Sequence, residues 1–274
     1  MTPEPLRVIS YGGGVQSTAL VVLAGLGRID YPVAIFSNVG DDSEDPLTIA
    51  YVEEHAIPWA DAHGISIVET QRRRRNGDLA PTLREEILRT DSRSIPIPVR
   101  MSNRAPGNRS CTGDYKIRPV QRWLREHGAT KDNVATVAVG FSTDELERAG
   151  NRTRAAYERI EYPLLDLRLS RGDCARIIAD AGLPVPPKSS CYFCPYHRPS
   201  TWAEMRRDRP ELFEAAAEIE DVVLARRAML GKDPTYLTER GRPIRDAIPP
   251  AQEGLFDPRD LDGGEICGDS SCFT

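Results

Sequence analysis

Residues Leu6–Leu26, LRVISYGGGVQSTALVVLAGL, decide the fold of this chain. The stretch begins with a short run of branched apolar residues, which is typical of a β-strand, and Gly12–Gly14 interrupt that run. After Ser17, apolar residues return with the spacing of one face of a helix. The sequence therefore predicts a strand, a glycine loop and a helix in direct succession.

The glycine loop has the composition of a phosphate-binding loop. Glycines carry no Cβ atom, so backbone N–H groups can approach an anion, and the N-terminus of the following helix adds partial positive charge. Gln16, Ser17 and Thr18 come next, and each of these side chains can form hydrogen bonds. The alternative is a tight turn between strand and helix that binds no ligand. The loop lacks the lysine of GxxxxGK[ST] and the spacing of GxGxxG, so it matches neither of these fingerprints.

The loop resembles the SGGxDS loop of the PP-loop superfamily, which contains ATP pyrophosphatases and sulfonucleotide reductases. The matching residues are Ser10, Gly12, Gly13, Gly14 and Ser17. This resemblance implies that the loop binds ATP or another adenine nucleotide, with Mg²⁺ as an accompanying ion. Many ATP-splitting members carry an aspartate where this chain has Gln16, which brings no negative charge to a magnesium ion. That difference weakens the inference of ATP cleavage more than the inference of adenylate binding.

Length and composition restrict the class of protein. A chain of 274 residues is long enough for one sizeable α/β domain and an appendage, and its formal net charge of −5 excludes a basic field over the whole surface. No apolar run reaches the roughly 20 residues of a membrane span, and the N-terminal residues lack the pattern of a signal peptide. We therefore expect a cytoplasmic protein without a membrane partner. In that reducing compartment, six cysteines are expected to bind metal, carry chemistry or lie buried as thiols.

Strands and helices continue to alternate after the glycine loop, which indicates the fold class. Apolar runs predict further strands at 31–37, 65–68 and 134–139, and a last strand or turn at 162–165. Helical patterns begin at Pro46, where Pro58 is expected to bend or split the helix, and at Cys111, Ser170 and Pro210. We predict an α/β fold with a doubly wound, mostly parallel, Rossmann-like sheet over 1–165. A C-terminal helical region with a CxxC site and a cysteine-containing tail is expected over 166–274.

Residues that follow the predicted strands are candidates for the nucleotide site, because ligands of parallel sheets gather beyond the carboxyl ends of strands. Phosphate is expected on Gly12–Ser17 and adenine along Asn38. Arg148, Arg152 and Arg154 are either surface helix charges or cations that close on the nucleotide. The predicted nucleotide-binding residues are Ser10, Gly12, Gly13, Gly14, Gln16, Ser17, Ser37, Asn38, Gly140, Asp144 and Arg148.

Two segments are rich in arginine. Arg72–Arg75 follow the third predicted strand, and the segment Asp91–Ser110 has the composition of a long loop, which is expected to be a functional lid or disordered. A solvated run of charge is one explanation of the four consecutive arginines. Their place on the ligand side of the sheet favours another, in which they grip phosphate or the backbone of a tRNA or DNA acceptor.

The cysteines form the second group of candidate residues. Cys191-x-x-Cys194 brings two thiols to one side of a turn, which suits zinc, an iron–sulfur cluster or a redox dithiol. Cys111 lies directly before a predicted helix, whose dipole favours a thiolate. Cys174 shares a helix face with apolar residues and is expected to be a core residue.

The cysteine layout resembles that of assimilatory adenylylsulfate reductases, which have a Cys-Cys pair before an x-x-x-Lys-x-x-Pro helix start, a distant CxxC and a Glu-Cys-Gly tail. The chain as a whole is most similar to the proteins called phosphoadenosine phosphosulfate reductase-like. Thr112 replaces the second cysteine of the pair. The matching residues are Cys111, Lys116, Pro119, Cys191, Cys194 and, in the tail, Cys267.

This resemblance implies a 4Fe-4S cluster held by Cys111, Cys191 and Cys194, and zinc is the alternative. Because Thr112 is no ligand, the tail cysteine Cys267 or Cys272 supplies the fourth ligand, or one iron stays open. Cys267, Cys272 and Lys116 are the candidate catalytic residues, with Cys267 as the nucleophile of a reductase and Lys116 neutralising a leaving charge.

Two classes of function remain open. The first is an enzyme of sulfur chemistry: an ATP-dependent sulfurtransferase, which the open cluster and the basic loops favour, or a reductase of adenylyl sulfate type. Such an enzyme needs a sulfur or electron donor protein, for example a cysteine desulfurase or a thioredoxin-like protein. The second is a non-catalytic nucleotide-binding module, stabilised by zinc, or the subunit of a complex.

Overall fold

The computed structural model describes residues 4–150 and 155–250, which form two compact units. Residues 4–80 and 114–190 belong to the first unit, and 81–113 with 191–250 belong to the second. The predicted tail residues Cys267 and Cys272 lie outside the described residues, as do Arg152 and Arg154.

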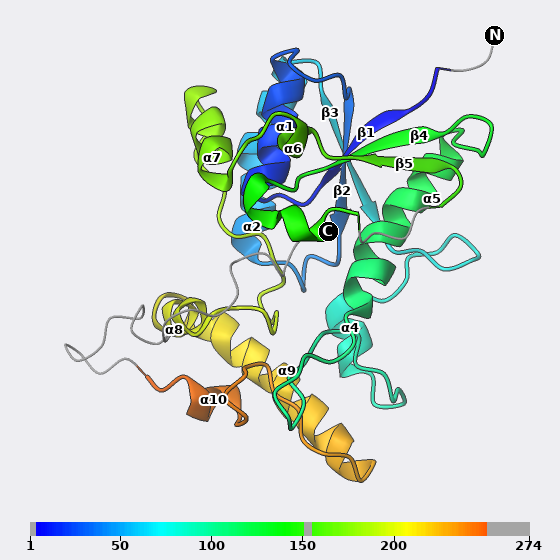
Figure 1. The fold of residues 1–274 in the computed structure, drawn as a ribbon. Helices are drawn as coiled ribbons and strands as arrows, with labels where there is room; N and C mark the ends of the chain where they lie inside the picture. The colour runs from blue at the N-terminus through cyan, green and yellow to red at the C-terminus, as the bar shows by residue number, and fades with distance from the viewer. Residues whose placement is uncertain (1–3, 151–154, 251–274) are drawn as a thin grey trace. The chain divides into compact units, whose positions relative to one another are not determined.

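The first unit is built on a five-stranded sheet in the order β3-β2-β1-β4-β5, and every neighbouring pair is parallel. The strand order reverses direction at β1, which is the hallmark of a doubly wound sheet. The predicted α/β fold class is therefore confirmed (Figure 1). The strands are β1 (Arg7–Tyr11), β2 (Val33–Asn38), β3 (Ser66–Gln71), β4 (Ala135–Val139) and β5 (Glu158–Glu161).

Helices cover both faces of this sheet, because successive side chains of the central strand point to opposite sides. Ile9 packs in one core with α1 (Val15–Gly25) and α7 (Arg171–Asp180), whereas Val8 packs in the other with α5 (Arg118–Glu126). Figure 1 shows α1 and α7 on one side of the sheet and α5 on the other. Cys174 of α7 is fully buried in the first core, which confirms its predicted place.

The helical segment between β2 and β3 shows how a proline is accommodated. It consists of α2 (Pro46–Tyr51), a π-helical turn (Val52–Ala56) and α3 (Ile57–Ala62). Pro58 has no N–H to offer the preceding turn, and the chain widens there, with Ile57 N–H donating to the carbonyl of Val52. The predicted disturbance at Pro58 therefore takes the form of a π turn. The same pattern recurs before α5, where the π turn Thr112–Ile117 precedes Pro119.

Three short elements differ from the sequence expectation or complete it. The last strand is β5, whereas the residues expected to form a last strand or turn form the short helix α6 (Pro163–Asp166). β5 is an edge strand of sequence Glu-Arg-Ile-Glu, and three of its four residues are charged, so it lacks the apolar pattern by which a strand is predicted. A 3-10 turn, Thr143–Arg148, follows β4. Ser170 and Asp173 form the predicted capping box of α7, which belongs to the first unit although the expected domain boundary preceded it.

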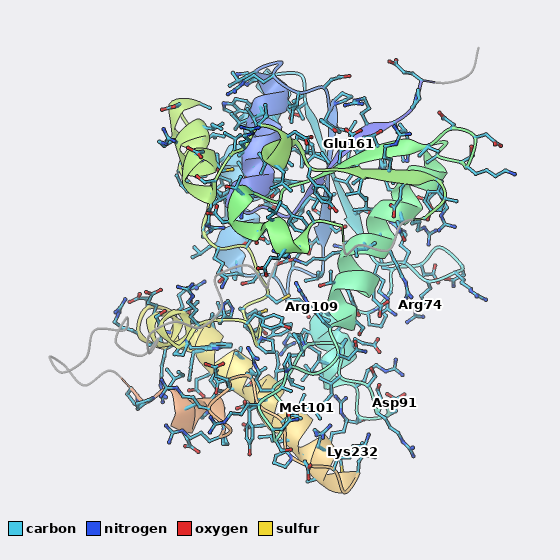
Figure 2. The ribbon with its side chains drawn as sticks, viewed as in Figure 1. Arg74, Asp91, Met101, Arg109, Glu161 and Lys232 are labelled. Atoms are coloured by element: carbon cyan, nitrogen blue, oxygen red, sulfur yellow. The ribbon has the colours of Figure 1, made fainter. Side chains whose placement is uncertain are left out.

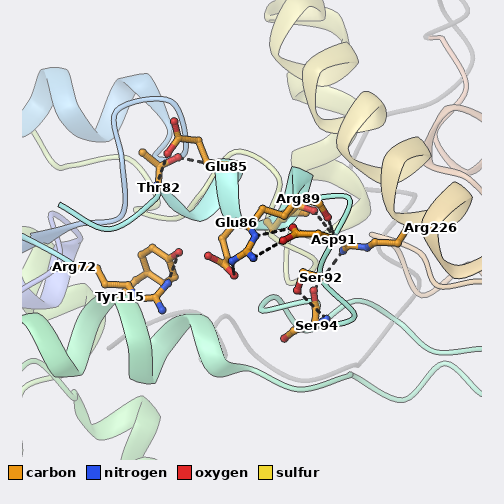
Figure 3. A network of polar contacts seen from close by, with 11 residues as sticks. Arg72, Thr82, Glu85, Glu86, Arg89, Asp91, Ser92, Ser94, Tyr115 and Arg226 are labelled. Atoms are coloured by element: carbon orange, nitrogen blue, oxygen red, sulfur yellow. Dashed lines mark hydrogen bonds and ion pairs between the residues drawn. The ribbon is translucent and has the colours of Figure 1, made fainter. Parts of the chain in front are cut away.

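The second unit is helical and contains α4 (Leu83–Leu88), α8 (Pro199–Asp208), α9 (Pro210–Met229) and α10 (Ile244–Ala247). Trp202 of α8 and Phe213 of α9 are fully buried and meet edge to face. Arg226 of α9 is buried, and its guanidinium donates to the backbone carbonyls of Ile87, Arg89 and Ser94 (Figure 3). These bonds tie α9 to α4 and to the start of the loop that follows α4.

The predicted long loop Asp91–Ser110 contains no named helix or strand. Arg100 exchanges backbone hydrogen bonds with Tyr236, at 2.7 and 2.9 Å, and a turn closes at Met101, which Figure 2 labels. The backbone of this loop is therefore partly paired within the second unit.

Glu220 of α9 gives a pH-dependent stability to the second unit. Its carboxylate is buried and accepts the N–H of Leu237 at 2.7 Å and that of Ile244 at 2.6 Å, and burial raises its pKa from 4.5 to about 7. The folded state thus holds this proton more tightly, so the free energy of unfolding falls by at most about 3 kcal/mol as pH rises from 4.5 to 7.

Glu220→Gln turns one acceptor oxygen into an NH₂ group that faces a backbone N–H, and we expect it to cost about 1–3 kcal/mol at pH 5. Urea unfolding at pH 5 and pH 7.5 measures both effects. The difference between wild type and variant should narrow at the higher pH, because only the wild type loses stability there. A constant difference would contradict the raised pKa.

Candidate functional site

Gly13 fixes the shape of the glycine loop between β1 and α1. Its φ is +71°, a conformation that glycine adopts readily and that other residues avoid. A Cβ atom built on Gly13 would lie 2.9 Å from Cγ2 of Thr48 and 3.2 Å from Cγ2 of Val52. The residue is therefore required to be glycine for two independent reasons.

The N-terminus of α1 has the features of an anion site. Gly14 is its N-cap, and no side chain in the described part of the chain caps the helix. The hydroxyl of Ser17 donates to the carbonyl of Gly14 at 3.1 Å and accepts the N–H of Gly12 at 3.2 Å, so it braces the loop. An eleven-residue helix without a side-chain cap offers its first N–H groups and its dipole to a phosphate.

Gly140, directly after β4, lies against the backbone of this loop. A Cβ atom on Gly140 would lie 3.0 Å from the carbonyl carbon of Gln16 and 3.0 Å from the nitrogen of Ser17. The close approach explains why glycine stands at the end of β4. Two predicted nucleotide-site segments, one after β1 and one after β4, are thus adjacent.

A buried polar network surrounds Gln16. Its amide nitrogen donates to Glu145 at 3.1 Å, and its amide oxygen accepts from Arg171 at 2.9 Å. Arg148 forms an ion pair with the same Glu145 and lies over the ring of Phe141. The predicted residues Gln16 and Arg148 are therefore brought together, because both side chains contact Glu145.

Asp144 has a local structural role in this network. Its carboxylate accepts the hydroxyl of Ser142 at 3.1 Å and the backbone N–H of Arg171 at 2.6 Å, at the start of α7. Sequence reasoning missed Glu145 and Arg171, which complete the network. Arg171 lies 155 residues from Gln16, so no local pattern could show their contact.

Glu145 places a carboxylate beside Gln16, the position at which many PP-loop enzymes that split ATP carry an aspartate. Its side chain is buried, and burial raises its pKa, while Arg148 and Arg171 lower it. The first turn of α1 thus has one carboxylate and two arginines near it.

Ser10, Gly12, Ser37 and Lys116 line one small cavity at the carboxyl ends of β1 and β2, together with Glu44. The cavity measures about 10 Å³, which is room for about one water molecule. Ser37 donates its hydroxyl to the carbonyl of Lys116 at 3.1 Å. Three predicted nucleotide-binding residues and the predicted catalytic lysine are thereby brought together.

Asn38, a predicted nucleotide-site residue, and Glu44, which was not predicted, both lie near the end of β2. The amide of Asn38 donates to Asp41 at 2.6 Å and to Glu69 at 3.0 Å, so this side chain braces the loop after β2. Glu44 was not predicted as a site residue, because it lies in a run of acidic loop residues, a pattern typical of a solvent-exposed loop. It is 2% exposed, one carboxylate oxygen has no hydrogen-bond partner among the described residues, and Nζ of Lys116 lies 3.9 Å from the other.

Removing the Lys116 charge should destabilise the fold in a pH-dependent way. Burial raises the pKa of Glu44 and Lys116 lowers it, so Lys116→Met should raise that pKa further. When the pKa of a carboxyl group is raised in the folded state, the free energy of unfolding of the protein falls as pH increases. We expect a loss of about 1–3 kcal/mol at pH 7.5 and a smaller loss at pH 5.

Urea unfolding at the two pH values tests this expectation, and the exposed Lys131→Met is the matched control. The free energy of unfolding of the control should differ from that of wild type by less than about 0.5 kcal/mol, the usual limit for a surface substitution. An equal loss at both pH values would show that Lys116 acts by packing alone.

The predicted thiol pair lies in a turn of the second unit. Cys194 N–H donates to the carbonyl of Cys191 at 3.1 Å, and His197 N–H donates to the carbonyl of Cys194 at 3.0 Å. Phe193, between the two cysteines, is fully buried. The turn is therefore anchored by its backbone and by one aromatic side chain.

Cys111 lies in the same unit, on a segment that contacts the thiol turn. Arg109 and Arg100 each place a guanidinium over the ring of Tyr196, at 5.3 and 5.4 Å, and Tyr196 follows Cys194 by two residues. Cys111 N–H donates to the carbonyl of Pro96 at 2.9 Å.

As donors, two or three thiols suit a cluster or zinc. Over 4–150 and 155–250, however, no three His, Cys, Asp or Glu side chains are grouped to hold a metal ion. Cys272, the predicted fourth ligand, lies outside those ranges. The complete ligand set stays a prediction.

None of the helices in the described residues combines the length and apolar character that crossing a membrane requires.

Comparisons with known proteins found similarity among solved structures. No family model and no curated protein matches the chain. Among solved structures, the chain is similar to phosphoadenylyl-sulfate reductase from Candida auris, crystallised as a phosphate complex. The similarity has 14% sequence identity and a TM-score of 0.42, and it covers 68% of this chain and 76% of the reductase chain.

Proposed function

We propose that this chain is an adenine-nucleotide-dependent enzyme of sulfur chemistry, similar to the PP-loop enzymes, whose loop Gly12–Ser17 binds the phosphate of the nucleotide. The observation that carries this proposal is the geometry of the loop. Gly13 has a positive φ and packs where no side chain fits, and it leads into a helix without a side-chain cap. The carboxyl ends of β1 and β2, where Lys116 lies, are where parallel sheets bind ligands.

The residues of the first unit have distinct roles in this proposal. Backbone N–H groups of α1 bind the phosphate, and Ser17 and Gly140 keep the loop in shape. Lys116 neutralises charge on the leaving group, and Glu44 holds its ammonium group near the strand ends. Glu145, held by Gln16, supplies a carboxylate close to the helix N-terminus, where a divalent cation would need one.

ATP-dependent sulfur transfer is the reaction we favour. An acceptor oxygen would attack the α-phosphorus of ATP and release pyrophosphate, and a sulfur nucleophile from a donor protein would then displace AMP. Cys111, Cys191 and Cys194, with Cys272, would hold an iron–sulfur cluster that binds sulfur. Reduction of a sulfonucleotide is the alternative, and Cys267 would be its nucleophile.

Isothermal titration calorimetry tests the phosphate site, and assays of the released products distinguish the two reactions. ATP and phosphoadenylyl sulfate should each bind at least about tenfold more tightly than adenosine, because the loop binds phosphate. GTP is the control for the base. Release of pyrophosphate from ATP would favour sulfur transfer, and release of sulfite from phosphoadenylyl sulfate would favour reduction. Equal affinity for adenosine and ATP would contradict the phosphate site.

The cysteine ligands can be tested independently of turnover. After anaerobic purification, iron and sulfide should be present in wild type and lost from Cys191→Ala and Cys194→Ala. Cys174→Ala is the matched control, because Cys174 is buried in the other unit and should leave the metal content unchanged. One zinc without sulfide would favour the non-catalytic, zinc-stabilised alternative. Metal content that survives the loss of both turn cysteines would exclude them as ligands.

A further inference from the structure

A basic groove crosses the outer side of α5 in the first unit. It has a volume of about 970 Å³ and is lined by Arg72–Arg75, which follow β3, and by Arg118, Arg122 and Arg125 of α5. Two carboxylates, of Asp114 and Glu126, also line it, which leaves a formal excess of five positive charges. The whole chain has a net charge of −5, so the groove opposes the general charge of the molecule.

The arginines of α5 form one row along the helix. Residues 118, 122 and 125 are spaced by four and three positions, so they share a face, and the row is about 10 Å long at 1.5 Å per residue. Arg118 pairs with Asp114, and Arg122 pairs with Glu126 at 2.7 Å. The two carboxylates therefore orient the row and do not neutralise the rest of the groove.

The loop after β3 is a folded hairpin. Arg74 N–H donates to the carbonyl of Asp78 at 2.8 Å, and Arg73 pairs with Leu79 as an antiparallel bridge. Arg122 donates to the carbonyl of Arg74 at 3.0 Å, which fastens the hairpin to α5. Figure 2 shows Arg74 beside α5, and Figure 3 shows the guanidinium of Arg72 on the Tyr115 hydroxyl. The arginines are thus presented by a structured surface.

The exposed arginines of this hairpin differ from those of α5 in their ion pairs. Arg73, Arg74 and Arg75 are exposed, and within the part of the chain that the structure describes none of them pairs with a carboxylate. Arg73 donates to the backbone carbonyl of Gly77 at 2.9 Å, and an arginine that is not paired with a carboxylate can bind a phosphate group in a bidentate manner.

We propose that this groove binds a nucleic-acid duplex through its phosphate backbones. The excess charge and the volume suit a polyanion better than a single phosphate, and duplex nucleic acid carries one charge per about 1.7 Å of axis. Single strands are bound by stacking bases on open aromatic rings. The ring that lines this groove is Tyr157, and the guanidinium of Arg125 lies over it at 5.9 Å. The groove therefore favours contacts with backbone over contacts with bases, and it binds without reading sequence.

Fluorescence anisotropy of the whole chain with a labelled 20-base-pair duplex tests this inference, in 50–200 mM KCl and without nucleotide. Neutralising about five phosphates predicts a slope of about −4.5 for log K against log[KCl]. Arg74→Gln with Arg125→Gln should reduce that slope by about 2 and weaken binding at least tenfold. The matched control is Arg28→Gln with Arg168→Gln, which removes two exposed arginines outside the groove and should change binding less than twofold.

Separate arms with duplex DNA, duplex RNA, single-stranded DNA and a poly-glutamate peptide identify the partner. Tighter binding of either duplex supports the inference and tells which duplex the groove prefers. Tighter binding of the single strand or the peptide would overturn it, as would absence of duplex binding at 50 mM KCl or equal losses in both double variants. Gly13→Ala should bind duplex like wild type, so failure of the nucleotide site and failure of the groove are distinguishable.

Discussion

Replacing Gly13 by alanine is expected to weaken adenine-nucleotide binding about 100-fold, which corresponds to about 2.7 kcal/mol. The free energy of unfolding should also fall by about 2–5 kcal/mol, because a left-handed φ costs about 1–2 kcal/mol for a residue with a Cβ atom and overpacking adds about 1–3. The methyl group would meet Thr48 at 2.9 Å, so the loop must move away from the shape that the proposed phosphate site needs. Calorimetric titration with ATP and urea unfolding measure the two effects.

Gly27→Ala is the matched control for this experiment. Gly27 has a φ of +69°, nearly that of Gly13, but no atom of the described residues lies within 4 Å of the position that its Cβ atom would take. The control should therefore lose about 1–2 kcal/mol of folding free energy, from the left-handed φ alone, and bind ATP as wild type does. If both variants bind ATP equally well, the loop is an ordinary turn and the phosphate site lies elsewhere.

Replacing Gly140 by alanine should weaken ATP binding about 30-fold with a smaller loss of stability, about 1–2 kcal/mol. The added methyl group would press on the backbone at Gln16 and Ser17, at 3.0 Å, where the first turn of α1 begins. Because backbone atoms cannot rotate away as a side chain can, the N–H groups of that turn should shift. The effect on binding should therefore exceed the effect on folding.

Gly172→Ala gives the comparison for Gly140→Ala. Neither glycine has a left-handed φ, and at Gly172 the nearest atom to an added Cβ is the Ser170 hydroxyl at 3.7 Å, which is ordinary contact. Alanine in α7 should be neutral or slightly stabilising, with ATP affinity unchanged. Weakened binding in both variants would mean that Gly140 does not act through the glycine loop.

The sequence predicted those parts of the fold that local physics determines. The glycine run between an apolar strand pattern and an apolar helix pattern predicted β1, the loop and α1. The alternation of strands with helices predicted the parallel sheet. The helix starts at Ser170 and Pro210 were predictable from capping and proline chemistry.

Parts that depend on distant contacts were not predictable. Glu145 and Arg171 meet at Gln16 from positions more than 120 residues away, and Glu44 is buried where it lines a cavity with the ends of β1 and β2. Strand β5 lacks an apolar pattern, because it is a charged edge strand. The arginines of α5 join Arg72–Arg75 only through the packing of that helix on the sheet.

Titration of the ¹⁵N-labelled chain with ATP, followed by amide chemical shifts, tests most directly whether the glycine loop binds the nucleotide phosphate. The largest shifts should occur at Gly12–Thr18, with smaller ones at Gly140 and Lys116, and they should be absent with adenosine. Shifts that leave Gly12–Thr18 unchanged, or that are largest at Arg72–Arg75 and along α5, would contradict the account.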